Sequence, residues 1–278
     1  MRNQKRGKMP VQHSAAVHRD NAVDNIALEL KQVSFCYEGV DKPTSILEGL
    51  DMQVFDGEFI SIIGASGSGK TTLFRLITGL EQPSNGRIHI NGEHLVNRLG
   101  SVGYMPQQDL LMPWRSIRDN AVLPLELKGM EKKTADNQVC ELLEEFGLGG
   151  YEEEYPDGLS GGMRQRVSFL RAVLSGSNVL LLDEPFSALD AMTKLSMQEW
   201  LLEQWEKRDQ TILFITHDVN EALFLSDRVF ILTENPVQKL EEVIVPLGRP
   251  RKLSDLNDPA VIRLKEQLID QFRVRVTV

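Results

Sequence analysis

One eight-residue segment of this 278-residue chain carries the clearest chemistry. It reads Gly64-Ala65-Ser66-Gly67-Ser68-Gly69-Lys70-Thr71 and satisfies the pattern GxxxxGK(S/T). Glycines let such a backbone curl so that successive N–H groups point at phosphate oxygens, and the helix that follows adds partial positive charge. We expect Lys70 to reach the β- and γ-phosphates of a nucleotide and Thr71 to ligate magnesium. A flexible Gly/Ser turn is the alternative, but the segment lies between a predicted strand and a predicted helix, as a phosphate loop does.

Two carboxylates form the second candidate group. The apolar run Val179–Leu182 is followed at once by Asp183 and Glu184. A strand end places such side chains at the edge of a sheet, where open α/β folds bind ligands. Asp183 is suited to hold magnesium through water, and Glu184, on the opposite side of the pleat, to orient and deprotonate an attacking water. An acidic turn without a catalytic role is the alternative, and the phosphate loop weighs against it.

A third segment could bind a second anion. Leu159-Ser-Gly-Gly-Met-Arg-Gln-Arg166 leads into the apolar stretch Val167–Leu174. If a helix starts here, Ser160, Gly161 and Gly162 offer a hydroxyl, bare backbone N–H groups and the helix dipole to an anion. For this motif alone, an ordinary serine N-cap with a glycine turn is the alternative.

Short apolar runs alternate with helical patterns along much of the chain, which predicts a largely parallel sheet covered by helices. The segment from Ile26 to Phe35 alternates in the manner of a strand with one wet face. A helix should begin at Lys70 or Thr71, and another behind Asp258–Pro259. From about 115 to 175 the strands give way to helices, which predicts an inserted helical subdomain. The further predicted strands are Glu58–Ile63, Arg87–Ile90, Val102–Met105, Val179–Leu182, Ile212–Ile215 and Arg228–Leu232.

The composition excludes several classes of protein. The chain is 41% hydrophobic and 26% charged, which is typical of a soluble globular protein, and no run approaches the ~20 apolar residues of a spanning helix. A net charge of -9 argues against general binding of nucleic acid. Cys36 and Cys140 have no metal-site spacing, so we expect buried free thiols. Residues 1–25 are polar, lack the apolar segment of a secretory signal, and are predicted to be a disordered tail.

In combination and in order, these motifs resemble those of the ABC ATPases. Leu159–Arg166 looks like the signature sequence of that family and separates the chain from P-loop kinases, GTPases and helicases. The resemblance covers residues 26 to 248; Met163 departs from it, since many members have glutamine there. It implies an α/β fold: a P-loop ABC ATPase core with a mostly parallel sheet, an N-terminal antiparallel β subdomain and a helical subdomain inserted at about 115–175. Residues 249–278 would form a C-terminal extension with an amphipathic helix.

The resemblance also implies ATP and Mg²⁺ as ligands and assigns roles to single residues. Tyr37 matches an aromatic residue that stacks on adenine, although a plain strand aromatic is the alternative. Gln107 matches the glutamine that touches magnesium and the attacking water, and His217 the switch histidine that contacts the γ-phosphate. The expected catalytic residues are Glu184, His217, Gln107 and Lys70. The expected nucleotide-binding residues are Tyr37, Gly64, Ala65, Ser66, Gly67, Ser68, Gly69, Lys70, Thr71, Thr72, Ser160, Gly161 and Gly162, and the expected metal ligands are Thr71, Gln107 and Asp183.

In this family the two anion sites belong to different subunits. The resemblance therefore implies a head-to-tail dimer, which we expect to be a homodimer, in which Ser160 and Gly162 of one copy close on the γ-phosphate held by Gly64–Thr71 of the other. Ser187-Ala-Leu-Asp190 matches the loop that communicates across this dimer. The apolar loop Leu110–Trp114 is expected to contact a transmembrane permease, with local packing as the alternative.

The chain resembles the nitrate/sulfonate/taurine group of importers, relatives of which also serve pyrimidine precursors of thiamine. Four segments carry this resemblance: Leu110–Trp114, Met163–Arg166, Asp183–Asp190 and Thr216–Ala222. This implies a peripheral subunit on the cytoplasmic face of the membrane, paired with a permease and, indirectly, with an extracytoplasmic solute-binding protein. A soluble, non-transport ABC ATPase of the repair or translation-associated kind is the alternative. The chain has one cassette and no sustained heptads between Thr71 and Leu159, which disfavours it.

Overall fold

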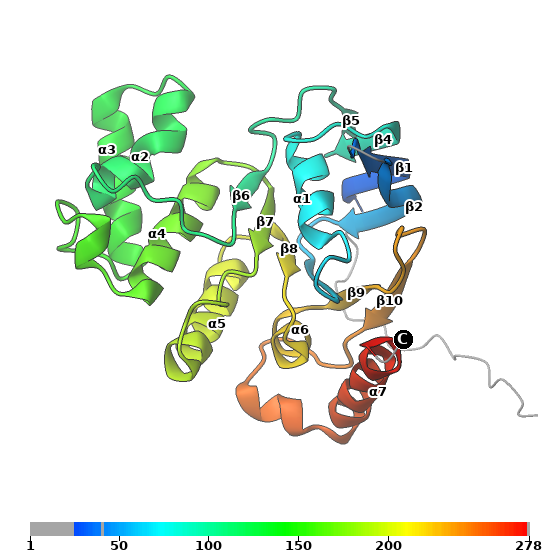
Figure 1. Ribbon diagram of the computed structural model, residues 1–278. Helices are drawn as coiled ribbons and strands as arrows, with labels where there is room; N and C mark the ends of the chain where they lie inside the picture. The colour runs from blue at the N-terminus through cyan, green and yellow to red at the C-terminus, as the bar shows by residue number, and fades with distance from the viewer. Residues whose placement is uncertain (1–24, 40–41, 277–278) are drawn as a thin grey trace, which may run out of the picture.

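The computed structural model describes residues 25–39 and 42–276, and shows two sheets, a group of helices to one side and a long C-terminal helix (Figure 1). The predicted disordered tail, residues 1–25, lies outside the described residues except for Asn25. No helix within the described ranges combines the length and the apolar character needed to cross a bilayer.

Six strands form the larger sheet of the described chain, in the order β10-β9-β3-β8-β7-β6. Its strands from β9 to β6 run parallel, and β10 pairs antiparallel with β9 at the edge. Every residue of β3, β7 and β8 is buried, as expected for short apolar runs covered on both faces. The mostly parallel α/β core is thus confirmed. The strands are β3 (Phe59–Gly64), β6 (Gly103–Met105), β7 (Val179–Asp183), β8 (Thr211–Ile215), β9 (Arg228–Leu232) and β10 (Leu240–Ile244).

The smaller sheet is antiparallel and contains, among the described residues, the strands β2-β1-β4-β5. We predicted Arg87–Ile90 for the parallel sheet, and this was wrong. The Asn91-Gly92 turn, with φ values of 51° and 78°, folds β4 back onto β5 as a hairpin, and β4 pairs with β1 instead. The strands are β1 (Ile26–Tyr37), β2 (Thr44–Phe55), β4 (Asn85–Ile90) and β5 (Glu93–His94).

A group of helices interrupts the parallel sheet between β6 and β7. It contains α2 (Ile117–Leu127), α3 (Lys132–Glu145), the 3-10 turn η1 (Pro156–Gly158) and α4 (Gly161–Leu174), and we call it the helical group. It forms the left part of Figure 1. Apolar residues of α2, α3 and α4 share one core with strands β7 and β8, so the helical group is packed onto the sheet rather than tethered to it.

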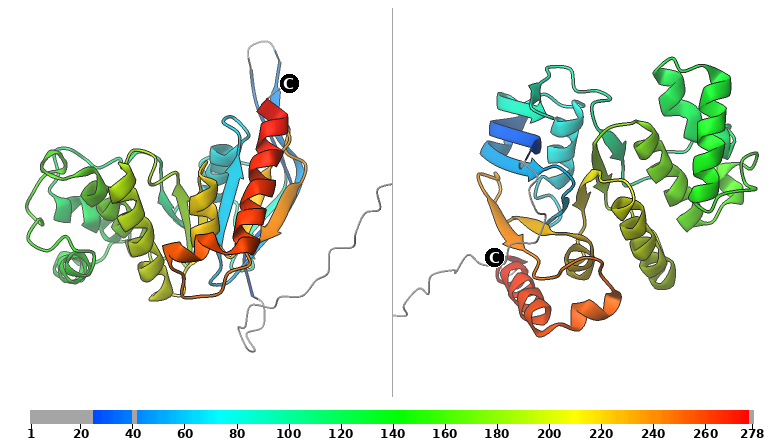
Figure 2. Two further views of the ribbon diagram at one scale, coloured as in Figure 1. Left: turned by 90° about the horizontal axis from the view of Figure 1, so that it is seen from below. Right: turned by 180° about the vertical axis from the view of Figure 1, so that it is seen from behind.

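The other helices cover the sheet. They are α1 (Lys70–Thr78), α5 (Ala191–Glu206), α6 (Val219–Leu225), the 3-10 turn η2 (Leu253–Asn257) and α7 (Pro259–Val276). The helix predicted behind Asp258–Pro259 is α7, which runs beside the β9–β10 edge (Figure 2). Val261 and Leu268 are buried against apolar residues of β3, α6 and β9, and the buried Arg251 donates hydrogen bonds to carbonyl groups at the end of α6. The C-terminal segment therefore belongs to the core.

We predicted buried free thiols. Both cysteines are free, but each is partly exposed. Cys36 stands near the end of β1, and Cys140 stands on the amphipathic helix α3 one position beyond the buried Val139. A neighbour of a core position on such a helix lies at the edge of the buried stripe, which explains the partial exposure.

Candidate active site

The phosphate loop, residues 64–71, joins the buried strand β3 to α1, which begins at Lys70 as expected. Gly67 and Gly69 have φ values of 77° and 95°, a region that side chains with a Cβ rarely adopt. Gly64 is constrained differently, because a Cβ there would lie 2.7 Å from Ser68 Oγ and 3.0 Å from the carbonyl oxygen of Leu232. The loop is thus both sharply curled and closely packed.

Lys70 is folded back into the loop. Its Nζ donates hydrogen bonds to the carbonyl oxygens of Gly64, at 2.9 Å, and Ala65, at 3.0 Å. Burial lowers the pKa of Lys70, while the charges of Glu184 and Asp183 oppose that shift. A phosphate bound in the loop would supply the negative charge that this poorly hydrated ammonium lacks.

Asp183 is the last residue of β7 and only 3% of its surface is exposed. Burial raises the pKa of its carboxyl group to about 6; a hydrogen bond with Thr71 and the charge of Lys70 act in the opposite direction, and the charge of Glu184 adds to the rise. The carboxylate is therefore held at an electrostatic cost that a bound cation would relieve.

Thr71 and Asp183 fit a magnesium ion that arrives with a nucleotide. A hydroxyl and one carboxylate are oxygen ligands of the kind that Mg²⁺ uses together with phosphate oxygens and water. The described residues contain no group of three or more His, Cys, Asp or Glu side chains that could hold a metal ion by themselves. The donor set thus suits a metal shared with a phosphate group.

Glu184 does not continue the pleat of β7, in contrast to our prediction. Its φ is 45°, so the backbone turns at this residue, and its N–H donates to the carbonyl oxygen of Ile215 at 3.0 Å. The turn is what brings the Glu184 carboxylate toward the loops that follow β6 and β8.

Two side chains from different loops approach the same carboxylate oxygen of Glu184. Gln107 Nε2 donates to Glu184 Oε2 at 3.2 Å, and His217 Nδ1 lies 3.4 Å from the same oxygen. Gln107 follows β6 and His217 follows β8, so the edge of the parallel sheet gathers residues that are 110 positions apart in the chain. We call this trio the carboxylate cluster; an oriented base next to a phosphate loop can activate a water for attack on phosphorus.

Tyr37 lies at the end of β1, with 38% of its surface exposed. Its hydroxyl is 3.4 Å from Thr72 Oγ1, in the first turn of α1, and its ring meets the ring of Phe35 edge-on at 4.8 Å. Tyr37 and Thr72 are thus near the phosphate loop, and the tyrosine ring has a partly free surface on which a base could stack.

The second predicted anion site is remote from the first. Ser160 is exposed and caps α4, because its Oγ accepts a hydrogen bond from the backbone N–H of Met163 at 3.3 Å. Gly161 and Gly162 form the first turn of that helix. Figure 1 shows α4 in the helical group, separated from α1 by β6 and β7. Within one chain, Ser160–Gly162 and the phosphate loop do not form one site.

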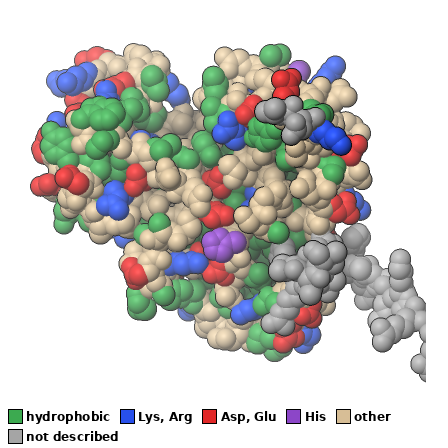
Figure 3. All heavy atoms as spheres, viewed as in Figure 1, with side chains coloured by type: hydrophobic (Ala, Val, Ile, Leu, Met, Phe, Trp, Pro, Cys, Tyr) green, Lys and Arg blue, Asp and Glu red, His purple; other side chains and the backbone are tan. Residues whose placement is uncertain are grey.

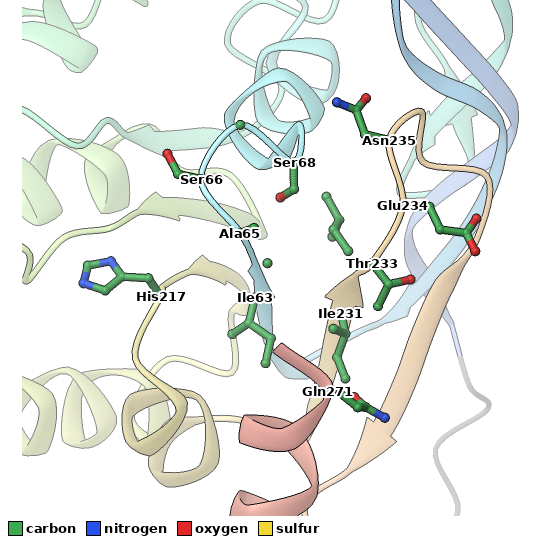
Figure 4. A pocket seen from close by; sticks show the side chains of 13 residues that line it. Ile63, Ala65, Ser66, Ser68, His217, Ile231, Thr233, Glu234, Asn235 and Gln271 are labelled. Atoms are coloured by element: carbon green, nitrogen blue, oxygen red, sulfur yellow. The ribbon is translucent and has the colours of Figure 1, made fainter. Parts of the chain in front are cut away.

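A pocket of about 440 Å³ flanks the phosphate loop on the side of α7 (Figure 4). Residues 64–68 line one wall, residues 231–235 of β9 and the following turn line another, and His217 and Gln271 complete it. Gln271 was not predicted at this site, since a glutamine on an amphipathic helix is ordinarily solvated. Its placement follows from the packing of α7 on the sheet.

The parallel sheet, the phosphate loop and the acidic end of β7 define a P-loop nucleotide-binding protein. Residues 47–187 match the family described as "ABC transporter", and the chain belongs to that family.

Similar proteins include the formylaminopyrimidine import ATP-binding protein ThiZ of Halalkalibacterium halodurans. It is 49% identical over 226 residues, which cover 81% of this chain and 87% of ThiZ. The nitrate import ATP-binding protein NrtD of Synechococcus elongatus is 40% identical, and the match covers 82% of this chain and 85% of NrtD. The aliphatic sulfonates import ATP-binding protein SsuB of Bacillus cereus is 36% identical, and the match covers 89% of this chain and 96% of SsuB.

Among solved structures, the ATP-binding cassette MJ0796, a dimer in a post-hydrolysis state bound to ADP and Pi, is similar to this chain. The TM-score is 0.69 at 27% identity, and the match covers 79% of this chain and 99% of that one. The resemblance to ABC import ATP-binding subunits of the nitrate/sulfonate group is confirmed, as is the prediction of a nucleotide-using ATPase of this family. These relatives give no support to the alternative of a non-transport ABC ATPase.

Proposed function

We propose that this chain is the subunit that binds and hydrolyses ATP to energise an importer of small solutes. The observation that carries the proposal is the carboxylate cluster, in which Gln107 and His217 both lie within 3.4 Å of Glu184 Oε2 beside the phosphate loop. A carboxylate with two polar partners from separate loops is suited to orient one water and accept its proton.

In the proposed reaction a water attacks the γ-phosphorus of ATP, and the bond from that phosphorus to the bridging oxygen of ADP breaks. Glu184 accepts the proton of the water, and Gln107 and His217 hold the base and the γ-phosphate in place. Lys70 contacts the β- and γ-phosphates with its ammonium group. Thr71 and Asp183 would hold Mg²⁺, which neutralises charge on the phosphate oxygens when bound.

The complete site requires two copies of the chain. Ser160 is exposed at the start of α4 and is remote from the phosphate loop of the same chain. A head-to-tail homodimer would place them on the γ-phosphate of the partner. The dimeric state of the similar cassette supports this arrangement.

A permease is the proposed membrane partner, and residues 110–114 are the proposed contact. Leu111 is buried, whereas 59% of Leu110 and 74% of Trp114 are exposed. Hydrogen bonds from Arg171 to the carbonyl oxygen of Leu110 and from the N–H of Met112 to Asn120 hold the backbone. Figure 3 shows hydrophobic side chains gathered over the helical group. Its large exposed apolar residues, and those of the loops beside it, include Leu110, Trp114, Leu127, Met130, Tyr151 and Tyr155. Such patches mark partner surfaces.

The proposed cargo is a small anionic or heterocyclic solute. Formylaminopyrimidine, aliphatic sulfonates and nitrate are named for the similar proteins, and they share small size and a polar group. An extracytoplasmic binding protein and the permease would select the solute. The ATPase subunit would lie on the cytoplasmic face, attached through the permease.

The substitution Glu184→Gln tests the proposed reaction. It keeps the size and the hydrogen-bonding reach of the side chain but removes the base, so turnover should fall by at least about 100-fold while ATP binding is retained. Steady-state ATPase of the full chain is measured at matched ATP occupancy, with Glu199→Gln at an exposed position of α5 as the control. Activity within a few-fold of the unsubstituted protein would show that Glu184 is not the base.

A further inference from the structure

A buried polar cluster connects α5 to the loop that carries His217. Glu221, on α6, is only 4% exposed. Its Oε1 accepts hydrogen bonds from Lys194 Nζ at 2.8 Å and from Gln198 Nε2 at 3.0 Å, and both donors lie on α5. Its Oε2 accepts a short hydrogen bond from Thr216 Oγ1. The glutamate is therefore satisfied from both sides, as a buried charge must be.

The same cluster fixes the residues on either side of His217. Lys194 Nζ also donates to Asp218 Oδ2 at 2.9 Å, and Thr216 Oγ1 accepts from the N–H of Asp218 at 3.0 Å. His217 itself has a side chain that is 64% exposed, and its ring lies 3.4 Å from Glu184. The position of the histidine is consequently set by its two neighbours in the chain more than by packing around its ring.

Charge supports this reading of the cluster. Burial alone would lower the pKa of Lys194, but hydrogen bonds and charges of Glu221 and Asp218 outweigh it and raise the pKa. Burial acts to raise the pKa of Asp218, yet Lys194 and backbone N–H groups hold it below its usual value. The ammonium group of Lys194 and the carboxylate of Asp218 are thus both charged at neutral pH.

The first turn of α5 and the loop just before it also contact the start of α4. A Cβ added to Gly162 would lie 3.0 Å from Thr193 Cγ2, and one added to Gly161 would lie 3.3 Å from Leu189 Cδ2. Lys194 is the residue after Thr193. One turn of helix therefore contacts the Ser160–Gly162 segment through Thr193 and the His217 loop through Lys194.

We infer that Lys194 and Glu221 are positioning residues that set His217 through Thr216 and Asp218, and that they couple its position to the start of α4. The inference deepens the proposed function and rests on the proposed role of His217. In a head-to-tail dimer, the start of α4 meets the ATP of the partner. Contact with that ATP would then alter, through α5 and Lys194, the position of His217 in the subunit's own site. Binding of ATP at one site would thereby affect the other site.

The first test is Lys194→Met in the full chain, with Lys207→Met at the exposed end of the same helix as the control. We expect kcat to fall at least 10-fold, KM for ATP to change less than 3-fold, and the Hill coefficient for ATP to fall toward 1. Unchanged kcat and Hill coefficient would overturn the inference. A loss of kcat that only matches a loss of ATP-binding capacity would overturn it too, because the pair would then serve folding alone.

A double-mutant cycle separates positioning from direct catalysis. If Lys194 acts through His217, adding Lys194→Met to His217→Ala should not lower the residual single-turnover rate further; an additive loss would overturn the inference. Thr216→Val, which removes the hydroxyl link with little change in volume, provides the same readouts if Lys194→Met does not fold. His217→Ala alone tests the proposed function: if it keeps full activity, that function fails whatever Lys194 does.

Discussion

The phosphate loop and the start of α4 are both glycine-containing turns that lead into a helix, but their surroundings differ. The phosphate loop is enclosed: Lys70 is folded onto its carbonyl groups, Asp183 is buried beside it, and Gly64 has no room for a side chain. Ser160, in contrast, stands exposed at the tip of α4 with its hydroxyl used only as a helix cap. An enclosed turn can grip a phosphate by itself, whereas an exposed one can act only on a ligand that something else holds.

The enclosed turn should be the more sensitive of the two. Lys70→Met removes the ammonium group that is folded into the loop, so we expect ATPase activity to fall by about 1000-fold and ATP binding to weaken in the same variant. Equilibrium binding of ATP and steady-state turnover are measured side by side, and Lys207→Met is again the control. If binding and turnover both stayed within a few-fold of the unsubstituted protein, the loop would not be the phosphate site.

The exposed turn should show the opposite pattern. Ser160→Arg places a bulky cation where the partner's γ-phosphate would approach, but it lies far from the phosphate loop of its own chain. ATP binding per subunit should stay unchanged while turnover falls by about 100-fold. Ser196→Arg, at an exposed position of α5, controls for the added charge. A parallel loss of ATP binding would indicate that both turns belong to one site within the chain.

Burial of Asp183 beside the phosphate loop should also lower the free energy of unfolding, and the size of this effect should depend on pH. The pKa of Asp183 is about 6 in the folded chain, against 3.8 for an unperturbed aspartate. Between these two values the carboxyl group of Asp183 is more fully protonated in the folded chain than in the unfolded chain. The free energy of unfolding therefore falls as pH rises from about 4 to 6 and stays lower above pH 6. Asp183→Asn lacks this charge and should stabilise the nucleotide-free protein by about 3 kcal/mol at pH 8.

Denaturant unfolding at pH 8 and pH 4, without nucleotide or divalent cation, checks the Asp183→Asn prediction. The gain should vanish at pH 4, where the carboxyl group is protonated in both states. Asp157→Asn, in the exposed part of η1, is the control. A gain that is the same at both pH values would mean that packing, rather than the buried charge, separates the two proteins.

The smallest effect on the isolated chain is expected at a surface that belongs to neither turn. Trp114→Ser removes an exposed side chain, so unfolding free energy should change by no more than about 0.5 kcal/mol and soluble ATPase activity by less than 2-fold. Its association with membranes that contain the permease should nevertheless drop, as measured by co-sedimentation, whereas Ile244→Ser, at an exposed apolar position of β10 outside the helical group, should leave the association unchanged. Full association of the Trp114 variant would remove residues 110–114 as the contact.

Local patterns predicted the enclosed turn well. The glycine spacing of the phosphate loop, the acidic end of β7 and the helix start at Lys70 all depend on neighbours in the chain, and the structure has the loop, the strand and the helix in these places. The left-handed φ of Glu184 was missed, because an apolar strand pattern carries no sign of where the backbone turns next.

Features that depend on distant contacts could not be read from the sequence. The strand β2 has an alternating buried pattern interrupted at Gly49, and β10 is a short, largely exposed edge strand, so neither stands out as an apolar run. The contact of Lys194 with Glu221 joins two helices across 27 positions, and each residue alone looks like an ordinary solvated charge. Only the packing of α5 on α6 makes them a pair.

Complementation between two inactive variants most directly tests whether the enclosed and exposed turns of different subunits make one active site. Ser160→Arg and Glu184→Gln chains are each inactive as homodimers on this view. In a mixed dimer, the intact phosphate loop and Glu184 of the first chain meet the intact Ser160 of the second. Mixing equal amounts should therefore restore activity, up to about a quarter of the original, since half of the dimers are mixed and each has one intact site; coupling between the two sites would lower this value. A mixture as inactive as its two components would contradict the shared site.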